Sequence, residues 1–432
     1  MRPILNLLVT SAIAGLALTT TGFSQSVELN VAMEAGRMAD AASSVVSAFE
    51  AQNPGIKVNI VPLPYTTFQQ KVTTELSAGS GAYDVIEAHA LMLVPLVGAK
   101  QVLPLDSYIK KTGLDMADFL KSQVAQSTLW GKGKELNPQG EFYGLPYNSD
   151  VFLFVYRKDI FDELGIKPTD SWEDLVKEFK SIPEKEHIAA YAFSGARRDN
   201  SHLIYDFYNI ALNLGGTLPL SADLKPTMNS AGNAKALSLL ADIVKSGEAP
   251  KGVEEYRYDD KNTAIAQGLA AAMSQWMLAC YKSVDDPAKS KVAGKIGYAP
   301  PPGGKSCSGG WVVSIVATTK HPEEAFKFIS FLTNQTNNLK LAIQYGDGPV
   351  RSSVVNSADF KQAYPFSEAL LAALNNGTNY IATAPQVAVW SQITDVITDR
   401  LADAIFNGTA PEAALKQADE QVAQVLKQSG YQ

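Results

Sequence analysis

The chain of 432 residues has few of the side chains that build metal or disulfide sites. It has two cysteines, Cys280 and Cys307, and four histidines that are scattered along the sequence. Two cysteines cannot form a disulfide framework or a four-cysteine zinc site. We therefore expect neither a metal nor a cofactor. Export would allow a Cys280–Cys307 disulfide, which we favour over the alternative of two separate thiols.

Positive charge is also in short supply. There are 37 Lys and Arg residues against 44 Asp and Glu residues, a formal net charge of −7, and no run of basic residues. Proteins that bind nucleic acid through its phosphates need a basic surface, so we expect no nucleic-acid partner. Hydrophobic residues make up 46% of the chain and charged residues 19%, which excludes an intrinsically disordered protein.

Long apolar runs are absent after the first residues. An apolar stretch from Ile4 to Leu18 is followed by small and polar residues, which predicts a signal peptide over residues 1–25. A membrane anchor is the alternative, but a spanning helix needs about 20 apolar residues. No cysteine lies in or directly after this segment to carry a lipid. We therefore expect the mature chain to be exported to the periplasm without a lipid anchor.

The rest of the chain alternates between strand and helix patterns. The first unit reads as strand, helix, strand, helix, strand over 27–33, 40–52, 56–61, 68–78 and 84–86. A second unit begins with an apolar strand over 151–156, and further strands are expected over 190–194, 270–274 and 311–317. This alternation predicts an α/β fold with parallel strands. Gly- and Pro-rich breaks at 300–310 and 346–349 separate its parts.

Catalytic signatures are missing. The Gly-Gly-Lys-Ser sequence at 303–306 does not complete a phosphate loop, because Ala299 stands where that motif needs glycine. Neither a Gly-x-Ser-x-Gly elbow nor a His-Glu-x-x-His motif occurs. We therefore predict a binding protein rather than an enzyme. The competing hypothesis is an exported carbohydrate-active enzyme, a glycosidase or lyase, which would need two carboxylates about 5–10 Å apart.

Several segments, in this order and spacing, resemble the maltose-binding-type family of extracellular solute-binding proteins, which serve ABC importers. They include FEAQNPGIKV from Phe49, YGLPY from Tyr143, SWEDL from Ser171, GGW from Gly309 and PEEAFKFI from Pro322. The resemblance implies a periplasmic binding protein fold of type II, in which two lobes are joined by three hinge crossings. It places lobe 1 at 26–142 and 312–350 and lobe 2 at 143–308 and 355–432. It further implies a monomer that delivers a sugar, glycoside or polyol to a membrane permease.

Ligands of open α/β sheets bind beyond the carboxyl ends of the strands. The residues that this rule selects after successive strands and loops are Glu34, Arg37, Tyr65, Glu87, His89, Tyr147, Asn148, Gly195, Arg197 and Trp276. The expected crossings add Gly310, Trp311 and Arg351. The resemblance adds Trp390, at a position where an aromatic ring often stacks on sugar.

These residue types suit a sugar, whose apolar faces stack on aromatic rings and whose hydroxyls pair with planar polar groups. Each has an alternative: Trp276 and Trp311 could be core residues, and the arginines could be surface charges. If several arginines do line the cleft, the ligand could instead carry a sulfonate, phosphate or carboxylate, which arginine binds through two parallel hydrogen bonds.

Overall fold

The computed structural model describes residues 26–431 apart from 128–139, 169–170, 198–201, 222, 279, 379–386 and 388. The expected signal peptide thus lies outside the described residues. Within them, no helix is both long enough and apolar enough to cross a membrane.

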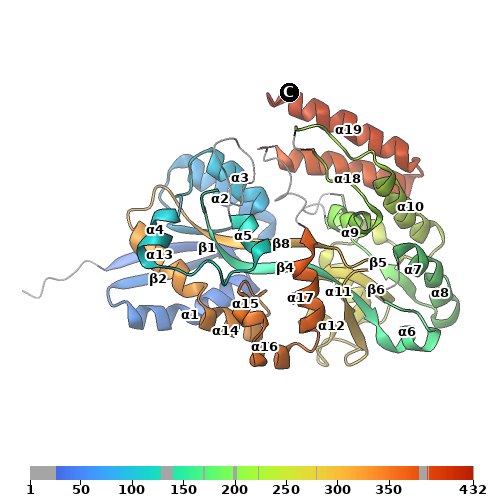
Figure 1. Cartoon of the computed structure of the whole chain (residues 1–432), viewed down its shortest axis with the longest axis horizontal. Helices are drawn as coiled ribbons and strands as arrows, with labels where there is room; N and C mark the ends of the chain where they lie inside the picture. Colours follow the sequence, from blue (N-terminus) through green and yellow to red (C-terminus); the bar gives the residue numbers. More distant parts are fainter. Residues whose placement is uncertain are drawn as a thin grey trace, which may run out of the picture.

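A mixed sheet runs through the whole molecule (Figure 1). Its strand order is β2-β1-β3-β8-β4-β6-β5, with β7 paired to β4 and β9 paired to β8. The strands β1 and β2 and the strands β1 and β3 are parallel, as the sequence pattern predicts, whereas β8 is antiparallel to both β3 and β4. The strands are β1 (Val27–Glu34), β2 (Ile56–Leu63), β3 (Val85–His89), β4 (Leu145–Arg157), β5 (Ala189–Ala192), β6 (Ala270–Trp276), β7 (Ile296–Ala299), β8 (Ser306–Ile315) and β9 (Gly377–Thr378).

Two lobes lie on either side of the long strands β4 and β8 (Figure 1). The first lobe has one hydrophobic core, drawn from residues 29–105, from Leu145 and Tyr147, and from 311–341. Its helices are α1 (Arg37–Gln52), α2 (Tyr65–Ala78), α3 (Ala90–Gly98), α4 (Asp106–Thr112), α13 (Pro322–Leu332) and α14 (Gln335–Tyr345). The fold class predicted from the sequence is confirmed. The lobe limits stay a prediction, although Leu145 and Tyr147 pack in the first lobe rather than the second.

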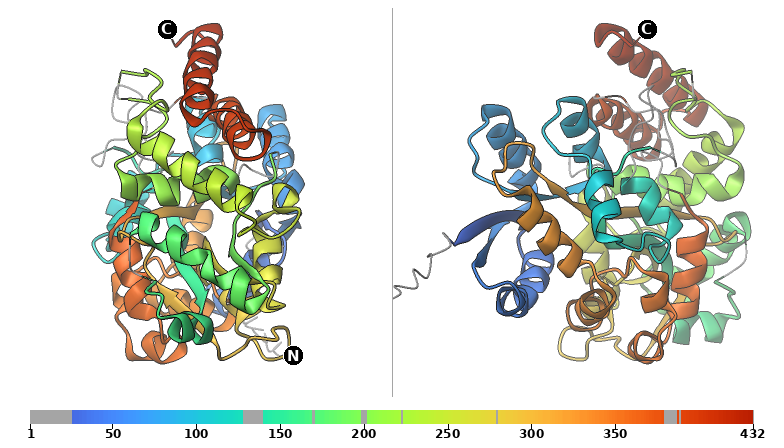
Figure 2. Two further views of the ribbon diagram at one scale, coloured as in Figure 1. Left: turned by 90° about the vertical axis from the view of Figure 1, so that its right-hand side faces the viewer. Right: turned by 60° about the vertical axis from the view of Figure 1, so that its left-hand side comes forward.

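The second lobe has two cores because successive residues of β4 point to opposite faces of the sheet. Phe152 and Phe154 pack under α6 (Lys158–Leu164), α7 (Trp172–Phe179), α8 (Ser181–Glu186), α9 (His202–Ala211), α10 (Ala231–Lys245), α18 (Trp390–Asn407) and α19 (Pro411–Gln428). Val151 and Leu153 pack on the other face, with α11 (Tyr258–Ala266), α12 (Tyr281–Val284), α15 (Ser352–Val355), α16 (Ala358–Ala363) and α17 (Ser367–Asn375). Figure 2 shows α18 and α19, in red, at one end of this lobe.

Three chain segments cross between the lobes, and they are bonded to one another. In the first two, Asn148 to Val151 of β4 pair with Trp311 to Ser308 of β8. The third, at 346–351, lies against β4: Ser149 donates its backbone N–H to the Gly348 carbonyl (3.1 Å) and its hydroxyl to the Pro349 carbonyl (2.6 Å). A Cβ on Gly348 would lie 1.6 Å from the Ser149 carbonyl oxygen, so only glycine allows this approach. The helix α5 (Lys121–Ser127) packs over β4 and β8 here.

The expected disulfide is wrong. Cys280 and Cys307 are both free and buried. Cys280 packs in the core beneath α11 and α17, whereas Cys307 packs in the core on the other face of the sheet, against Tyr205. The sequence separation allowed a bond, but the sheet separates the two side chains.

We therefore expect two thiols per chain when the protein is denatured without reductant. Burial raises the pKa of the Cys280 thiol to about 12 and also raises that of Cys307, so neither thiolate forms near neutral pH. Both thiols should react with a thiol reagent only after unfolding, and added reductant should leave the melting temperature unchanged. A count of zero thiols in the denatured, unreduced chain would show that the disulfide exists.

Candidate functional site

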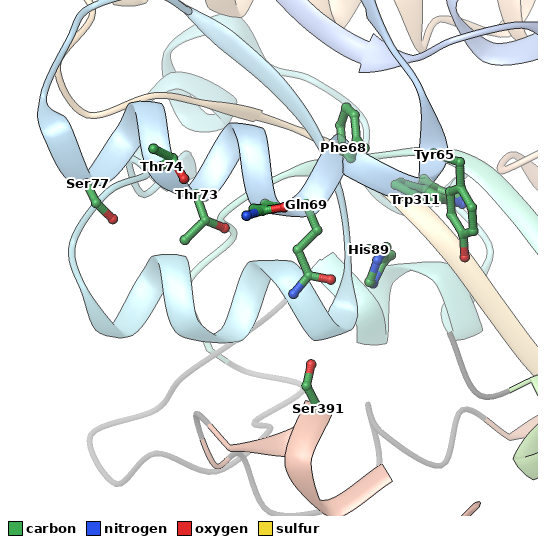
Figure 3. A pocket seen from close by; sticks show the side chains of 10 residues that line it. Tyr65, Phe68, Gln69, Thr73, Thr74, Ser77, His89, Trp311 and Ser391 are labelled. Carbon is green, nitrogen blue, oxygen red and sulfur yellow. The ribbon is translucent and has the colours of Figure 1, made fainter. Parts of the chain in front are cut away.

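A cavity of about 670 Å³ opens between the lobes (Figure 3). Helix α2, the end of β3 and β8 supply most of its wall from the first lobe, and the start of α18 supplies one residue from the second. The lining residues are Tyr65, Phe68, Gln69, Gln70, Thr73, Thr74, Ser77, His89, Trp311 and Ser391. Tyr65 and His89 were predicted from the strand ends and Trp311 from an expected crossing, and the structure brings these three together.

Aromatic rings gather at one end of this cavity. The Trp311 ring meets Phe68 and His89 edge to face, with ring centroids 6.0 and 4.8 Å apart. His89, the last residue of β3, is the direct partner of Trp311 in β8, so the sheet register places the two rings side by side. Trp311 is 8% exposed, so it belongs to the core and lines the cavity at the same time. Burial lowers the pKa of His89 to about 4, so this end is uncharged at neutral pH.

Polar side chains line the rest of the cavity. Tyr65, Gln69, Thr73 and Ser77 follow one another at intervals of four residues, so they share one face of α2 (Figure 3). The described lining residues include no aspartate, glutamate, lysine or arginine. Their amides and hydroxyls can each donate and accept hydrogen bonds, as a hydroxyl-rich ligand requires.

Five other predicted residues meet at the hinge instead. We call this group, with Asp150 and Asp347, the hinge cluster: Glu34, Arg37, Glu87, Tyr147, Asn148, Asp150 and Asp347. Arg37 forms an ion pair with Asp347 and donates to the Gly346 carbonyl at 3.1 Å. The Tyr147 hydroxyl lies 2.9 Å from Asp347 Oδ2 and 3.0 Å from the Met38 carbonyl oxygen. The strand register shifts between Pro146 and Asn148, and such an irregularity re-aims a side chain.

Asn148 connects the crossings within this cluster. Its Oδ1 accepts from the Gly348 backbone N–H, and its Nδ2 donates to Asp150 Oδ2 at 3.0 Å. Asn148 is fully buried. Its carboxamide therefore has a structural role, tying the third crossing to the first, and contact with a ligand stays a prediction for which this placement gives no support.

The carboxyl groups of the hinge cluster hold protons unusually tightly. Burial raises the pKa of Glu34 to about 7, although Arg37 opposes the shift. Burial raises the pKa of Asp347 to about 6. Glu87 is 0% exposed, and burial followed by repulsion from Glu34 raises its pKa further. Glu87 Oε2 accepts from the Glu34 backbone N–H at 2.9 Å, while its Oε1 has no partner among the described residues.

These shifts set the direction of the pH dependence of stability. Unfolded carboxyl groups titrate near pH 4, so between about pH 4 and pH 7 the folded chain binds more protons than the unfolded chain. We expect the stabilisation from these groups to be complete below pH 4 and to disappear as the pH rises through 6 and 7. The melting temperature should fall by roughly 5 °C between pH 5 and pH 8, and Glu34→Gln should flatten the slope. A slope unchanged by Glu34→Gln would contradict the assignment.

The remaining predicted residues lie away from the cavity. Gly195 is closed off by η2 (Val253–Glu255), since a Cβ there would meet the Val253 carbonyl at 2.2 Å. A Cβ on Gly310 would likewise meet the Gln123 amide. Trp390 is 2% exposed and packs in the core, so the expected sugar-stacking surface is not presented. Both glycines and Trp390 thus have packing roles in this structure.

The candidate arginines already have acidic partners. Arg197 pairs with Asp403 at 2.9 Å and lies 3.8 Å from Asp399, both on α18. Arg351 pairs with Asp118 at 3.2 Å, donates to the Thr333 carbonyl and lies over the Phe119 ring. Together with the Arg37–Asp347 pair, these contacts give each of the three arginines an acidic partner within the chain.

Trp276 lies on the second-lobe side of the crossings. Its ring packs against Phe152 and Tyr205, with centroids 4.2 and 5.0 Å apart, and it is half-buried. A Cβ on Gly309 would lie 3.2 Å from this ring, so the glycine of β8 allows Trp276 to pack closely against the crossing strand. Its role in binding stays a prediction.

Several lining and hinge residues could not be found from strand ends. Gln69, Thr73 and Ser77 lie inside a helix, and Ser391 comes from the far lobe. The four-residue spacing of polar side chains on α2 was the available signal. Asp347 lies in a Gly-rich break, 310 residues from the Arg37 with which it pairs.

Comparison with known proteins places this fold and cavity in context. The model of the bacterial extracellular solute-binding protein family matches residues 35–339. A protein of Brucella abortus (strain 2308), named only as a binding protein, is 26% identical over 419 residues, covering 95% of this chain and 96% of its own length. The mannitol-binding protein of Pseudomonas aeruginosa is 23% identical and covers 89% of both chains.

Two solved structures of solute-binding proteins have a similar fold. The maltose-bound MalE3 of T. maritima superposes with a TM-score of 0.80 at 27% identity, covering 93% of this chain and 100% of its own. A ribitol complex of an ABC transporter solute-binding protein from Agrobacterium radiobacter K84 has a TM-score of 0.78 at 23% identity, covering 92% and 98%. With two lobes, three crossings and a family match over most of its length, the chain belongs to the bacterial extracellular solute-binding proteins.

Proposed function

We propose that this protein is the periplasmic solute receptor of an ABC importer and that it binds a neutral sugar, glycoside or polyol. The observation that carries the proposal is the cavity between the lobes, whose described lining residues form an aromatic end and a wall of uncharged amides and hydroxyls. Relatives and structural neighbours named for mannitol, ribitol and maltose support it. The paired arginines argue for a neutral ligand over an anionic one.

The two-lobed geometry supplies the mechanism. A ligand that contacts α2 in one lobe and α18 in the other binds more tightly when the lobes are closed, and it shifts the population toward the closed form. We infer that the closed form docks on a membrane permease, whose associated ATPase supplies the energy. A monomer in the periplasm, exported by the signal peptide, completes the proposal.

An enzymatic role is disfavoured by the placement of the acidic residues. A glycosidase would need two carboxylates facing a substrate across a cleft. Glu87 is fully buried and the described cavity wall carries no carboxylate. We therefore propose that the ligand leaves the site chemically unchanged.

A thermal-shift screen tests the function. Neutral monosaccharides, disaccharides and polyols are compared with acidic glycosides, and hits are confirmed by calorimetry. A ligand at 100 times its Kd adds about 2.7 kcal/mol to stability, so a neutral hit should raise the melting temperature visibly. Prolonged incubation of the hit should yield no product. Preference for acidic glycosides would remove the neutral assignment, and turnover would remove the receptor assignment.

A further inference from the structure

We infer that the cavity takes an elongated ligand, a neutral oligosaccharide or glycoside of two or more rings that lies along α2. This inference rests on the proposed function and narrows it. The relatives do not decide the matter, because they are named both for single polyols and for the arabinooligosaccharide bound by a protein of Halalkalibacterium halodurans, which is 23% identical and covers 91% of this chain.

The length of the polar row is the first argument. Tyr65 and Ser77 both line the cavity, and Gln69 and Thr73 lie between them on the same face of α2. A helix rises 1.5 Å per residue, so the row is about 18 Å long. A single sugar ring at the aromatic end would leave most of this row facing water.

The distribution of side-chain types is the second argument. Among the described lining residues, the aromatic rings gather at the end formed by Tyr65, Phe68, His89 and Trp311. Beyond them the wall offers the amides of Gln69 and Gln70 and the hydroxyls of Thr73 and Thr74. Ser77 Oγ accepts from Gln101 Nε2 at 3.2 Å and can still donate. One ring can therefore stack at the aromatic end while further rings form hydrogen bonds along the helix.

The size of the cavity and its second wall complete the case. Its 670 Å³ falls in the range of about 300–1,000 Å³ that holds drug-sized ligands. Figure 3 shows Ser391 of α18 across the cavity from Gln69, about one helical turn along the row from Tyr65. A ligand that extends past the aromatic end therefore reaches the second lobe as well as the first.

The test is a chain-length series on the full mature protein by calorimetry. Glucose, maltose and maltotriose form one series, arabinose, arabinobiose and arabinotriose a second, and mannitol and ribitol serve as compact ligands. In at least one series the longer members should bind at least tenfold more tightly than the monosaccharide and both polyols. Thr73→Val, which removes a hydroxyl from the middle of the row, should weaken the longer ligands at least fivefold and the monosaccharide less than twofold.

Thr67→Val is the matched control, since Thr67 lies on α2 outside the cavity wall and should change no affinity. Equal or tighter binding of a monosaccharide or polyol, or a Thr73→Val effect independent of ligand length, would overturn the inference while leaving the proposed function standing. Failure of every sugar and polyol in the series and in the screen would overturn the proposed function, and the inference with it.

Discussion

Replacing Lys261 by methionine is expected to lower the melting temperature by about 10 °C. Lys261 and Asp206 are both 0% exposed, and the ammonium lies 2.9 and 3.0 Å from the two carboxylate oxygens. It also donates to the Ser274 carbonyl at 2.8 Å and lies over the Phe152 ring. Removing one partner of a buried pair costs about 3–5 kcal/mol, because the other charge stays buried. One kcal/mol moves the melting temperature of a unit of 150–250 residues by about 2–4 °C.

A double variant distinguishes the effect of the unpaired buried charge on Asp206 from the effect of lost packing. In Lys261→Met with Asp206→Asn, the amide oxygen still accepts from the Ser194 backbone N–H, a bond of 2.9 Å in the native chain. We expect this double variant to recover at least half of the loss. Lys158→Met is the control, since its pair with Asp162 is exposed, and surface pairs contribute at most about 1 kcal/mol. A double variant that melts below the single one would refute the explanation.

Replacing Trp311 by alanine is expected to weaken ligand binding by at least 30-fold. Trp311 is the largest aromatic ring in the cavity wall and is held by Phe68 and His89 on its edges. Removing an aromatic residue at the centre of a binding site commonly costs about 2 kcal/mol or more, which is roughly 30-fold in Kd. Calorimetry with the tightest sugar from the screen measures the change.

Because Trp311 is largely buried, its removal also lowers stability, and a second variant keeps the test clear. Tyr65→Ala removes a half-buried ring from the same wall and should weaken binding at least tenfold with a smaller change in melting temperature. Trp172→Phe is the matched control: Trp172 is buried in α7, away from the cavity, and its Nε1 has no partner among the described residues. It should lower stability and leave Kd within twofold. Unchanged affinity in Trp311→Ala would make Trp311 a core residue only.

The alternating pattern of apolar residues was enough to predict most of the strands. Strand β4 is longer than its apolar part: it begins at Leu145, before the polar segment Asn148 to Asp150. The sequence pattern placed these polar residues in a loop, but their backbone pairs with β8, and Asn148 and Asp150 belong to the hinge cluster. Helix α14 was not predicted from its Gln- and Asn-rich sequence, since its N-cap Asn334 and its packing on α1 decide its formation.

Strand ends predict which residues converge, but not which of them face a ligand. His89 and Tyr65 reach the cavity because β3 ends and α2 begins at its edge, and Trp311 reaches it as the partner of His89 on the neighbouring strand. Arg37 and Arg351 occupy positions that were equally suitable for ligand contact, but they form ion pairs with Asp347 and Asp118. Those partners come from distant segments, so sequence spacing carries no signal for them. The anionic ligand considered from the sequence depended on arginines that the folded chain neutralises.

The bonded crossings determine how the two halves can move. Three separate segments would let the lobes twist, slide and bend, but here the crossing at 346–351 is hydrogen-bonded to β4 at Gly348, and β4 is paired with β8 in the sheet. We therefore expect the three bonded segments to bend together as one thin layer and to resist sliding past one another. Closure should then follow a single coordinate, which a pair of fluorophores, one on each lobe, would report. A side chain at position 348 would collide with the Ser149 carbonyl group and push this crossing away from β4.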